Sequence, residues 1–133
     1  MTMLRTLRLA LDSPLAGAGA ALAYGGWALL ANLDGGVDAA VRAGLLHGAI
    51  SAALTFVGVR LVATVHRRVC HAGLAALGAL VVTYAASVGL HLALHTPHVL
   101  LTLLPGLLPT VGFTAGYALL VARTSPCDAR VRA

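Results

Sequence analysis

The sequence contains no lysine, glutamate or glutamine, and only 10% of its 133 residues carry a charge. Soluble domains average about 25% charged residues, and a fold this short has too much surface for so few charges to cover. The scarcity of charge therefore excludes an ordinary water-soluble domain. Because the apolar content is 59% and the mean hydropathy is +0.92, we expect hydrocarbon to surround most of the chain.

Other absences narrow the function. The two cysteines, Cys70 and Cys127, are too few for a disulfide framework and form no Cys-x-x-Cys motif. The sequence has no Gly-rich phosphate loop, no paired carboxylates within an apolar run and no serine nucleophile elbow. A conventional enzyme is therefore not expected, although chemistry on a lipid inside the membrane stays open. The basic residues are scattered along the chain, mostly between the apolar runs, and do not gather on one face, so we expect no nucleic-acid partner.

What remains is four apolar runs, each near or above the ~20 residues that a helix needs to cross a bilayer. They are rich in Ala and Leu and do not alternate, which is typical of helices and not of barrel strands. The chain is therefore predicted to be a single all-α domain, an integral membrane bundle of four transmembrane helices. The predicted helices are 15–33, 43–65, 72–94 and 97–122.

Proline marks the start of two of these helices and the interior of one. Ser13-Pro14 and Thr96-Pro97 both match an N-cap residue followed by proline at the first helical position. Pro105 and Pro109 each remove a backbone hydrogen bond within the last helix, so we expect a kink there. The kink either borders a binding site, where freed carbonyls meet a ligand, or is satisfied by neighbouring threonines.

The placement of arginine predicts the orientation. Only Arg42 lies in the first loop and none lies in the last loop, while all the others fall on the opposite side. Such a bias indicates that both termini face the cytoplasm (N-in, C-in), and the Ala-, Gly- and Arg-rich composition suggests a bacterial inner membrane. The others are Arg5, Arg8, Arg60, Arg67, Arg68, Arg123, Arg130 and Arg132. Of these, Arg60, Arg67 and Arg68 form a basic collar suited to anionic lipid headgroups.

Polar side chains recur every four residues on the second and third helices, which stacks them along one face of each helix. Turned inward, these faces form a polar seam that is either a substrate path or a set of ordinary interhelical hydrogen bonds. The residues of the predicted path are His47, Ser51, Thr55, Thr83, Ser87, His91, His95, Pro105, Pro109 and Thr110. The first and last helices add Tyr24, Asn32, Thr102, Thr114 and Tyr117 to the seam.

Histidines gather toward the outer ends of the helices, where ionisable residues are costly and are functional candidates. They suit a proton-coupled transport site, a divalent metal site made of His91, His95, His98 and Asp34, or haem ligation by His47 and His91. Alternatively, headgroups and water simply solvate them at the interface. No cofactor follows from these patterns alone. We expect replacement of His91 and His95 by alanine to abolish function and to leave folding intact.

Small residues also recur at four-residue spacing, and in lipid such stripes let helix backbones approach closely. A chain this rich in Ala and Gly also produces them by chance. The stripes are Gly17/Ala21/Gly25, Gly44/Gly48/Ala52, Ala85/Gly89 and Gly112/Gly116.

The leading hypothesis is that the chain moves or binds a small or lipidic substrate across the cytoplasmic membrane. Four thin helices leave little room for an internal path, so we expect a homo-oligomer or a larger membrane complex. One alternative is a non-catalytic accessory subunit of such a complex. Another is a metal- or haem-binding membrane protein that uses the histidine cluster.

The membrane assignment predicts that the protein is extracted from membranes only with detergent. The orientation predicts that an impermeant thiol reagent applied to intact cells does not label cysteines placed at the termini, because both termini face the cytoplasm. Recovery in the soluble fraction, or labelling of either terminus from outside, contradicts the corresponding prediction.

Overall fold

The computed structural model describes residues 2–96 and 98–125, and all regular structure in these residues is helical. Four segments are long and apolar enough to span a membrane: Pro14–Ala31, Val37–Val69, Ala72–Ala93 and Val99–Thr124. The predicted all-α class with four apolar helices is thus confirmed, and it indicates a membrane protein. Pro97, Cys127, Arg130 and Arg132, on which some predictions fall, lie outside the described residues.

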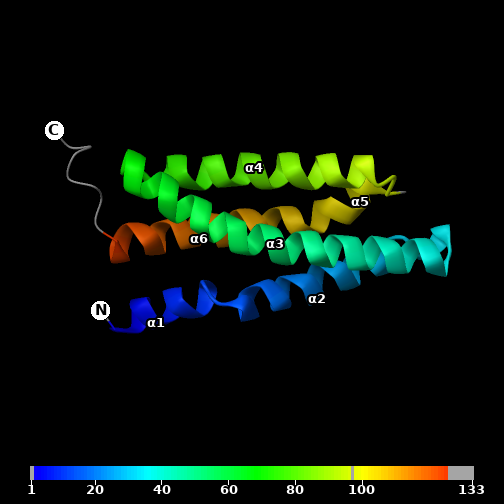
Figure 1. Cartoon of the computed structure of the whole chain (residues 1–133), viewed down its shortest axis with the longest axis horizontal. Coiled ribbons are helices and arrows are strands. Elements are labelled where there is room, and N and C mark those ends of the chain that lie inside the picture. The colour runs from blue at the N-terminus through cyan, green and yellow to red at the C-terminus, as the bar shows by residue number, and fades with distance from the viewer. Residues whose placement is uncertain (1, 97, 126–133) are drawn as a thin grey trace.

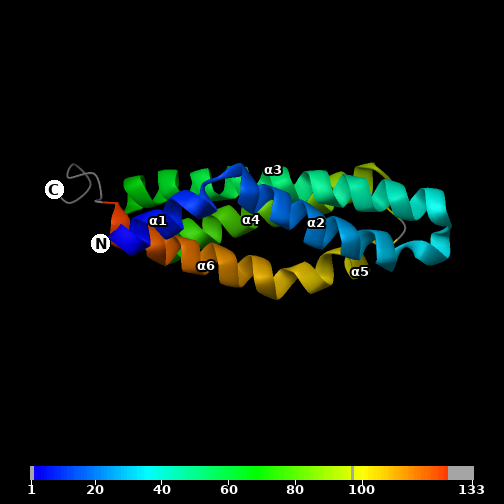
Figure 2. The same ribbon diagram turned by 90° about the horizontal axis from the view of Figure 1, so that it is seen from below.

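The long helices lie side by side in an elongated bundle (Figures 1 and 2). The end that carries the first helix and the last turn of the final helix is called the terminal end, and the opposite end is called the distal end. The elements in chain order are α1 (Thr2–Leu11), α2 (Pro14–Ala31), η1 (Leu33–Gly35), α3 (Val37–Val69), α4 (Ala72–Ala93), α5 (Val99–Leu103), η2 (Leu104–Gly106) and α6 (Leu107–Thr124).

A short helix that the sequence patterns do not predict, α1, precedes the first span and continues its line (Figure 1). An isolated helix of this length is marginal in water, so tertiary contacts must hold it. Arg8 donates to the Thr124 hydroxyl at 3.1 Å and to the Ser125 hydroxyl, both at the end of α6. As predicted, α2 begins at Pro14 after Ser13, although the Ser13 hydroxyl donates back to the Ala10 carbonyl at 2.6 Å and does not cap α2.

The second span is longer than its apolar run suggests. α3 has 33 residues and is therefore about 50 Å long, and most of the region predicted as the first loop belongs to its first turns. Asp38 lies in the first turn, where a negative charge is favourable near the helix N-terminus. Charged residues at 38 and 42 thus extend the helix beyond its apolar part instead of marking a loop.

The fourth span is interrupted at the predicted kink. Pro105 lies in the 3-10 segment η2, and Pro109 lies in the first turn of α6, where a missing N–H leaves no intrahelical bond unmade. The expected N-cap at Thr96 is not observed: α5 begins at Val99 after His98, and the Thr96 hydroxyl bonds to His91 instead.

Tight packing joins α2 to α3 through the first two small-residue stripes. A Cβ atom added at Gly25 would lie 2.8 Å from the Gly44 carbonyl oxygen, and one added at Gly48 would lie 3.0 Å from the Ala21 carbonyl oxygen. These two stripes therefore form one close interface. The glycines of the other two stripes, Gly89, Gly112 and Gly116, are exposed and would meet no atom within 4 Å.

A compact core of α3, α4 and α6 residues fills the bundle toward the terminal end. Its residues are Val59, Val62, Ala63, Ala75, Ala76, Ala79, Tyr117, Ala118 and Val121. Alanines on α4 let that helix approach α3 and α6 closely, so this part of the bundle is tightly filled.

The glycine interface predicts opposite effects for two adjacent substitutions. Gly25→Ala places a methyl group against the backbone of α3, so we expect it to lower the free energy of unfolding by ~1–3 kcal/mol. Gly26→Ala meets no atom within 4 Å, and alanine is the better helix former, so stability is expected to stay equal or rise. Thermal unfolding of both variants in detergent measures the difference, and equal midpoints would contradict the interface.

Candidate ligand cavity

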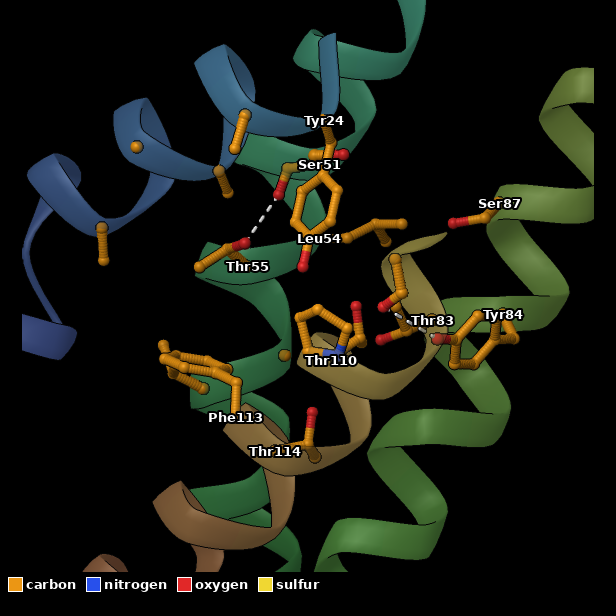
Figure 3. Close-up of a pocket in the computed structure, with 18 of the residues that line it drawn as sticks. Tyr24, Ser51, Leu54, Thr55, Thr83, Tyr84, Ser87, Thr110, Phe113 and Thr114 are labelled. Carbon is orange, nitrogen blue, oxygen red and sulfur yellow. Dashed lines mark hydrogen bonds between the residues drawn. The ribbon is translucent and has the colours of Figure 1, made fainter. Parts of the chain in front are cut away.

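A cavity of about 390 Å³ lies in the middle of the bundle, lined mainly by residues of α2, α3, α4 and α6, with Leu103 of α5 and Gly106 of η2 (Figure 3). Its volume falls within the range of ~300–1,000 Å³ that is usual for small-molecule sites. Val59, Val62 and Tyr117 belong both to its lining and to the core, so the core closes it toward the terminal end.

The cavity faces outward between α2 and α6. α2 packs along α3, and α6 packs on both α3 and α4, whereas α2 and α6 scarcely touch each other. The rim residues Gly19 and Ala23 on α2, and Pro109 and Phe113 on α6, are exposed. The opening therefore lies on the long side of the bundle and not at its ends.

Hydrogen bonds close both ends of this opening, from α2 and Asn32 to α5 at one end and from Asp12, just before α2, to α6 at the other. At the distal end, the Trp27 indole N–H donates to the Leu101 carbonyl at 3.1 Å, and the Asn32 amide donates to the Thr102 hydroxyl at 3.1 Å. At the terminal end, the Tyr117 hydroxyl donates to the Asp12 carboxylate. These contacts are called the distal latch and the terminal latch, and between them the side of the cavity is open.

Most of the predicted path residues line this cavity. His47, Ser51 and Thr55 come from α3, Thr83 and Ser87 from α4, and Pro109 and Thr110 from α6. The other three do not line it: His91 lies buried behind His47, whereas His95 and Pro105 are exposed.

Further lining residues come partly from the seam and partly from positions without a clear signal. Tyr24, Thr114 and Tyr117 line the cavity, as their place in the seam suggests, whereas Asn32 and Thr102 belong to the distal latch. Tyr84 is missed because it lies one position off the four-residue stripe of α4. The small residues of α2 that face the cavity are also missed, since alanine and glycine are too common here to single out; they are Ala16, Gly19, Ala20 and Ala23.

Protein groups satisfy the carbonyls around the proline kink. Pro105 has no N–H for the carbonyl of Leu101 four residues earlier, and the Trp27 indole supplies that hydrogen instead. The Tyr84 hydroxyl lies 3.5 Å from the Gly106 carbonyl oxygen and 3.3 Å from that of Leu107. At the Leu101 carbonyl, Trp27 thus takes the role that we expected of threonines or a ligand, while Tyr84 adds contacts to the carbonyls that follow Pro105.

His47 forms part of the distal wall of the cavity, and His91 lies directly behind it. Nδ1 of His47 lies 2.8 Å from Nε2 of His91, and Nδ1 of His91 lies 2.8 Å from the Thr96 hydroxyl. His47 is 5% exposed and His91 is 0% exposed. The ring of Tyr24 lies edge-on to His47, with centroids 6.1 Å apart. Threonine, His91 and His47 therefore form a buried hydrogen-bonded chain that ends at the cavity.

The direct bond between the two imidazoles bears on the haem and metal hypotheses. Two nitrogens on one tetrahedral zinc lie about 3.3 Å or more apart, since each Zn–N bond is ~2.0–2.1 Å, and a haem iron separates axial ligands further. At 2.8 Å, His47 and His91 leave no place for an ion between their rings. In this arrangement the two imidazoles are hydrogen-bonded to each other and do not share a metal ion.

The remaining predicted metal ligands are dispersed. Nε2 of His98 lies 3.2 Å from the Asp34 carboxylate, with both side chains exposed at the distal end, and His95 is exposed on a left-handed turn (φ 54°). Within residues 2–96 and 98–125, no group of three or more His, Cys, Asp or Glu residues is placed to hold a metal ion. The structure therefore pairs His98 with Asp34 but does not assemble the set His91, His95, His98 and Asp34.

The predicted lipid-contact arginines are all exposed on the terminal half of α3. The Arg60 guanidinium carbon lies 3.9 Å from the centroid of the Phe56 ring, which directs this cation along the helix surface. Arg67 donates to the Thr64 hydroxyl at 3.3 Å. Arg60, Arg67 and Arg68 are thus exposed near the terminal end, and their contact with lipid headgroups stays a prediction.

No protein-family model, no curated protein and no solved structure matches this chain. The function must therefore be inferred from the cavity, its opening and the chemistry of its lining.

The buried histidine chain changes one expectation drawn from the sequence. Because His91 is fully buried with hydrogen bonds at both ring nitrogens, His91→Ala should destabilise the fold by ~2–4 kcal/mol. His95→Ala removes only an exposed side chain and should change stability by less than ~0.5 kcal/mol. Unfolding midpoints in detergent test this, and equal midpoints would contradict the buried chain.

Proposed function

We propose that this protein is a bundle of four transmembrane helices that binds a small lipidic molecule in the cavity between α2 and α6. The observation that carries the proposal is the side opening, which is bounded by the two latches. In a spanning bundle, the long sides face hydrocarbon, so an opening there receives molecules dissolved in the membrane and not solutes from water.

The residues of the rim support entry into the cavity from the bilayer. On α2 the rim consists of glycine and alanine, which leave space, and on α6 the exposed Phe113 and Pro109 offer apolar contact. A molecule that reaches the cavity from the bilayer keeps its tail in an apolar medium throughout. Its tail gains little from burial, and the hydroxyl-bearing interior is what distinguishes the site from lipid.

We place the terminal end in the cytoplasm of a bacterial cell, so that the protein is integral to the inner membrane. The described arginines at that end include Arg5, Arg67, Arg68 and Arg123, whereas Arg42 lies near the distal end. This distribution follows the positive-inside rule. The cavity then lies between the two membrane surfaces, nearer to the outer one at its histidine wall.

Binding is better supported than passage through a fixed path. The polar seam of α3 continues from His47 to Thr55 and then gives way to Val59 and Val62, which are buried in the core. A polar group would meet packed valine and alanine on its way to the cytoplasmic side. Movement across the membrane would require this core to rearrange, whereas binding requires only the opening that is present.

The accessory-subunit alternative has one observation in its favour. The small-residue stripes of α4 and α6 are exposed, and in a membrane such stripes are suitable surfaces for another helix. A larger complex or a homo-oligomer is compatible with the cavity, because no part of the cavity depends on a second chain.

Cavity-filling substitution tests the proposed function. Gly58 lines the cavity, and its nearest neighbour there is the Thr83 hydroxyl, 3.9 Å from an added Cβ. In reconstituted vesicles, we expect Gly58→Leu to reduce cavity labelling by a photoactivatable long-chain alcohol about tenfold, because overlap of this kind costs on the order of 1–3 kcal/mol.

Gly89→Leu is the matched control, since Gly89 is exposed on α4, outside the cavity, and meets no atom within 4 Å. Labelling in this variant should equal that of the wild type. Mass spectrometry of the crosslinked peptides locates the label. Labelling spread evenly over the lipid-facing residues, or unaffected by Gly58→Leu, would disprove the proposed site.

A further inference from the structure

The cavity contains polar groups but no formal charge of its own. Among the described residues that line it, none is arginine or aspartate, and the polar groups are hydroxyls together with the imidazole of His47. At the terminal end, Arg8 and Asp12 lie beyond Tyr117, with 3.6 Å between Nε of Arg8 and the Asp12 carboxylate. A charged headgroup in this cavity would lose its hydration without meeting an opposite charge, which is strongly unfavourable.

Three of the lining hydroxyls, those of Thr55, Tyr84 and Tyr117, already bond to protein groups. The Thr55 hydroxyl donates to the Ser51 carbonyl at 2.7 Å within its own helix, and Tyr84 points to the carbonyls of the kink (Figure 3). Hydroxyls used in this way retain acceptor capacity but supply weaker recognition than a group whose donor or acceptor has no protein partner.

His47 has such a group. Its Nδ1 is bonded to His91, and its Nε2 has no hydrogen-bond partner among residues 2–96 and 98–125. The ring is nineteen-twentieths buried and borders the cavity, with Ser51 one helical turn further along α3. Nε2 of His47 is not among the enclosed atoms that lack a partner, so it is accessible from the cavity, and a ligand that supplies a partner there gains affinity.

The chain behind His47 allows this nitrogen to act in either sense. If the Thr96 hydroxyl donates to His91, then His91 donates to Nδ1 of His47, and Nε2 of His47 carries hydrogen and is a donor. If His91 donates to Thr96, then His47 donates to His91, and Nε2 of His47 is an acceptor. Both arrangements keep both rings neutral and satisfy every bond in the chain.

From these observations we infer that the cavity selects an amphiphile with an uncharged polar group, a hydroxyl or a carbonyl, and that Nε2 of His47 binds this group. The tail leaves through the opening between α2 and α6, because the cavity volume holds only the polar end and the adjoining part of a long chain. This inference rests on the proposed binding function and adds the chemical class of the ligand.

The test uses probes that share one long diazirine-bearing tail and differ only in the head: an alcohol, a methyl ketone, a carboxylate and a trimethylammonium group. Each is added to wild-type protein in phosphatidylcholine vesicles and photolysed, and label in cavity peptides is quantified. We expect the alcohol and the ketone to label the cavity about tenfold more than either charged probe.

Two variants test the role of His47. His47→Phe keeps a ring but removes both nitrogens, so labelling by the alcohol and the ketone should fall about fivefold, the effect of one neutral hydrogen bond. His47→Gln retains a donor and an acceptor, so most of the preference for the uncharged probes should persist. Should His47→Phe fail to fold, labelling of His47→Gln and of the wild-type protein by the four probes still tests whether the cavity prefers uncharged heads.

The outcomes separate the inference from the function on which it rests. Equal labelling by all heads, or preference for a charged head, overturns the inference while Gly58→Leu still blocks labelling. Unchanged labelling in His47→Phe, or complete loss of preference in His47→Gln, overturns the assignment to His47. Absence of cavity labelling with every probe overturns the proposed function itself.

Discussion

The rest of the structure depends on how closely α2 lies against α3. Gly25, Gly44 and Gly48 bring carbonyl oxygens of the two helices within about the distance at which a methyl group would clash. This contact holds α2 on one side of the bundle, while the alanines of α4 draw α4 toward α3 and α6. Because α2 is committed to α3, it does not reach α6 along most of its length. The cavity and its side opening are therefore consequences of glycine packing on the opposite face of the same helix.

Composition and periodicity were sufficient for the broad architecture. Four apolar runs predicted four helices, and steps of four residues on α3 and α4 predicted which polar side chains share an interior, because a helix places such residues on one face. These arguments need no knowledge of neighbours. The cavity itself exists because α2 and α6 scarcely touch each other, and no local pattern records this. The same limit explains Tyr84, whose position next to Thr83 gives no hint that it faces the kink.

The differences from expectation have a common cause, since each involves a side chain whose partner is distant in sequence. Thr96 resembles an N-cap, but the buried Nδ1 of His91 takes its hydroxyl. His91 resembles a metal ligand, but His47 is within hydrogen-bonding distance on the adjacent helix. α1 ends just before the helix-breaking Asp12-Ser13-Pro14 segment, and it is stabilised by residues at the other end of the described chain, Thr124 and Ser125. In each case a tertiary contact outweighs the local signal.

The hydrogen bond from the Trp27 indole to the Leu101 carbonyl ties α2 to the kinked part of the last span. It satisfies the carbonyl that Pro105 leaves without a backbone donor, and in the proposed membrane setting hydrocarbon offers no water to replace it. Separating the distal parts of α2 and α5 would expose that carbonyl. The width of the opening beside α2 and the bend of the last span are therefore thermodynamically linked. Any molecule that wedges the two segments apart must also compensate a bare carbonyl, and one that carries a donor near its head does so at least cost. Because Pro105 leaves the Leu101 carbonyl dependent on Trp27, the opening widens at least cost for a ligand that can itself donate a hydrogen bond to that carbonyl.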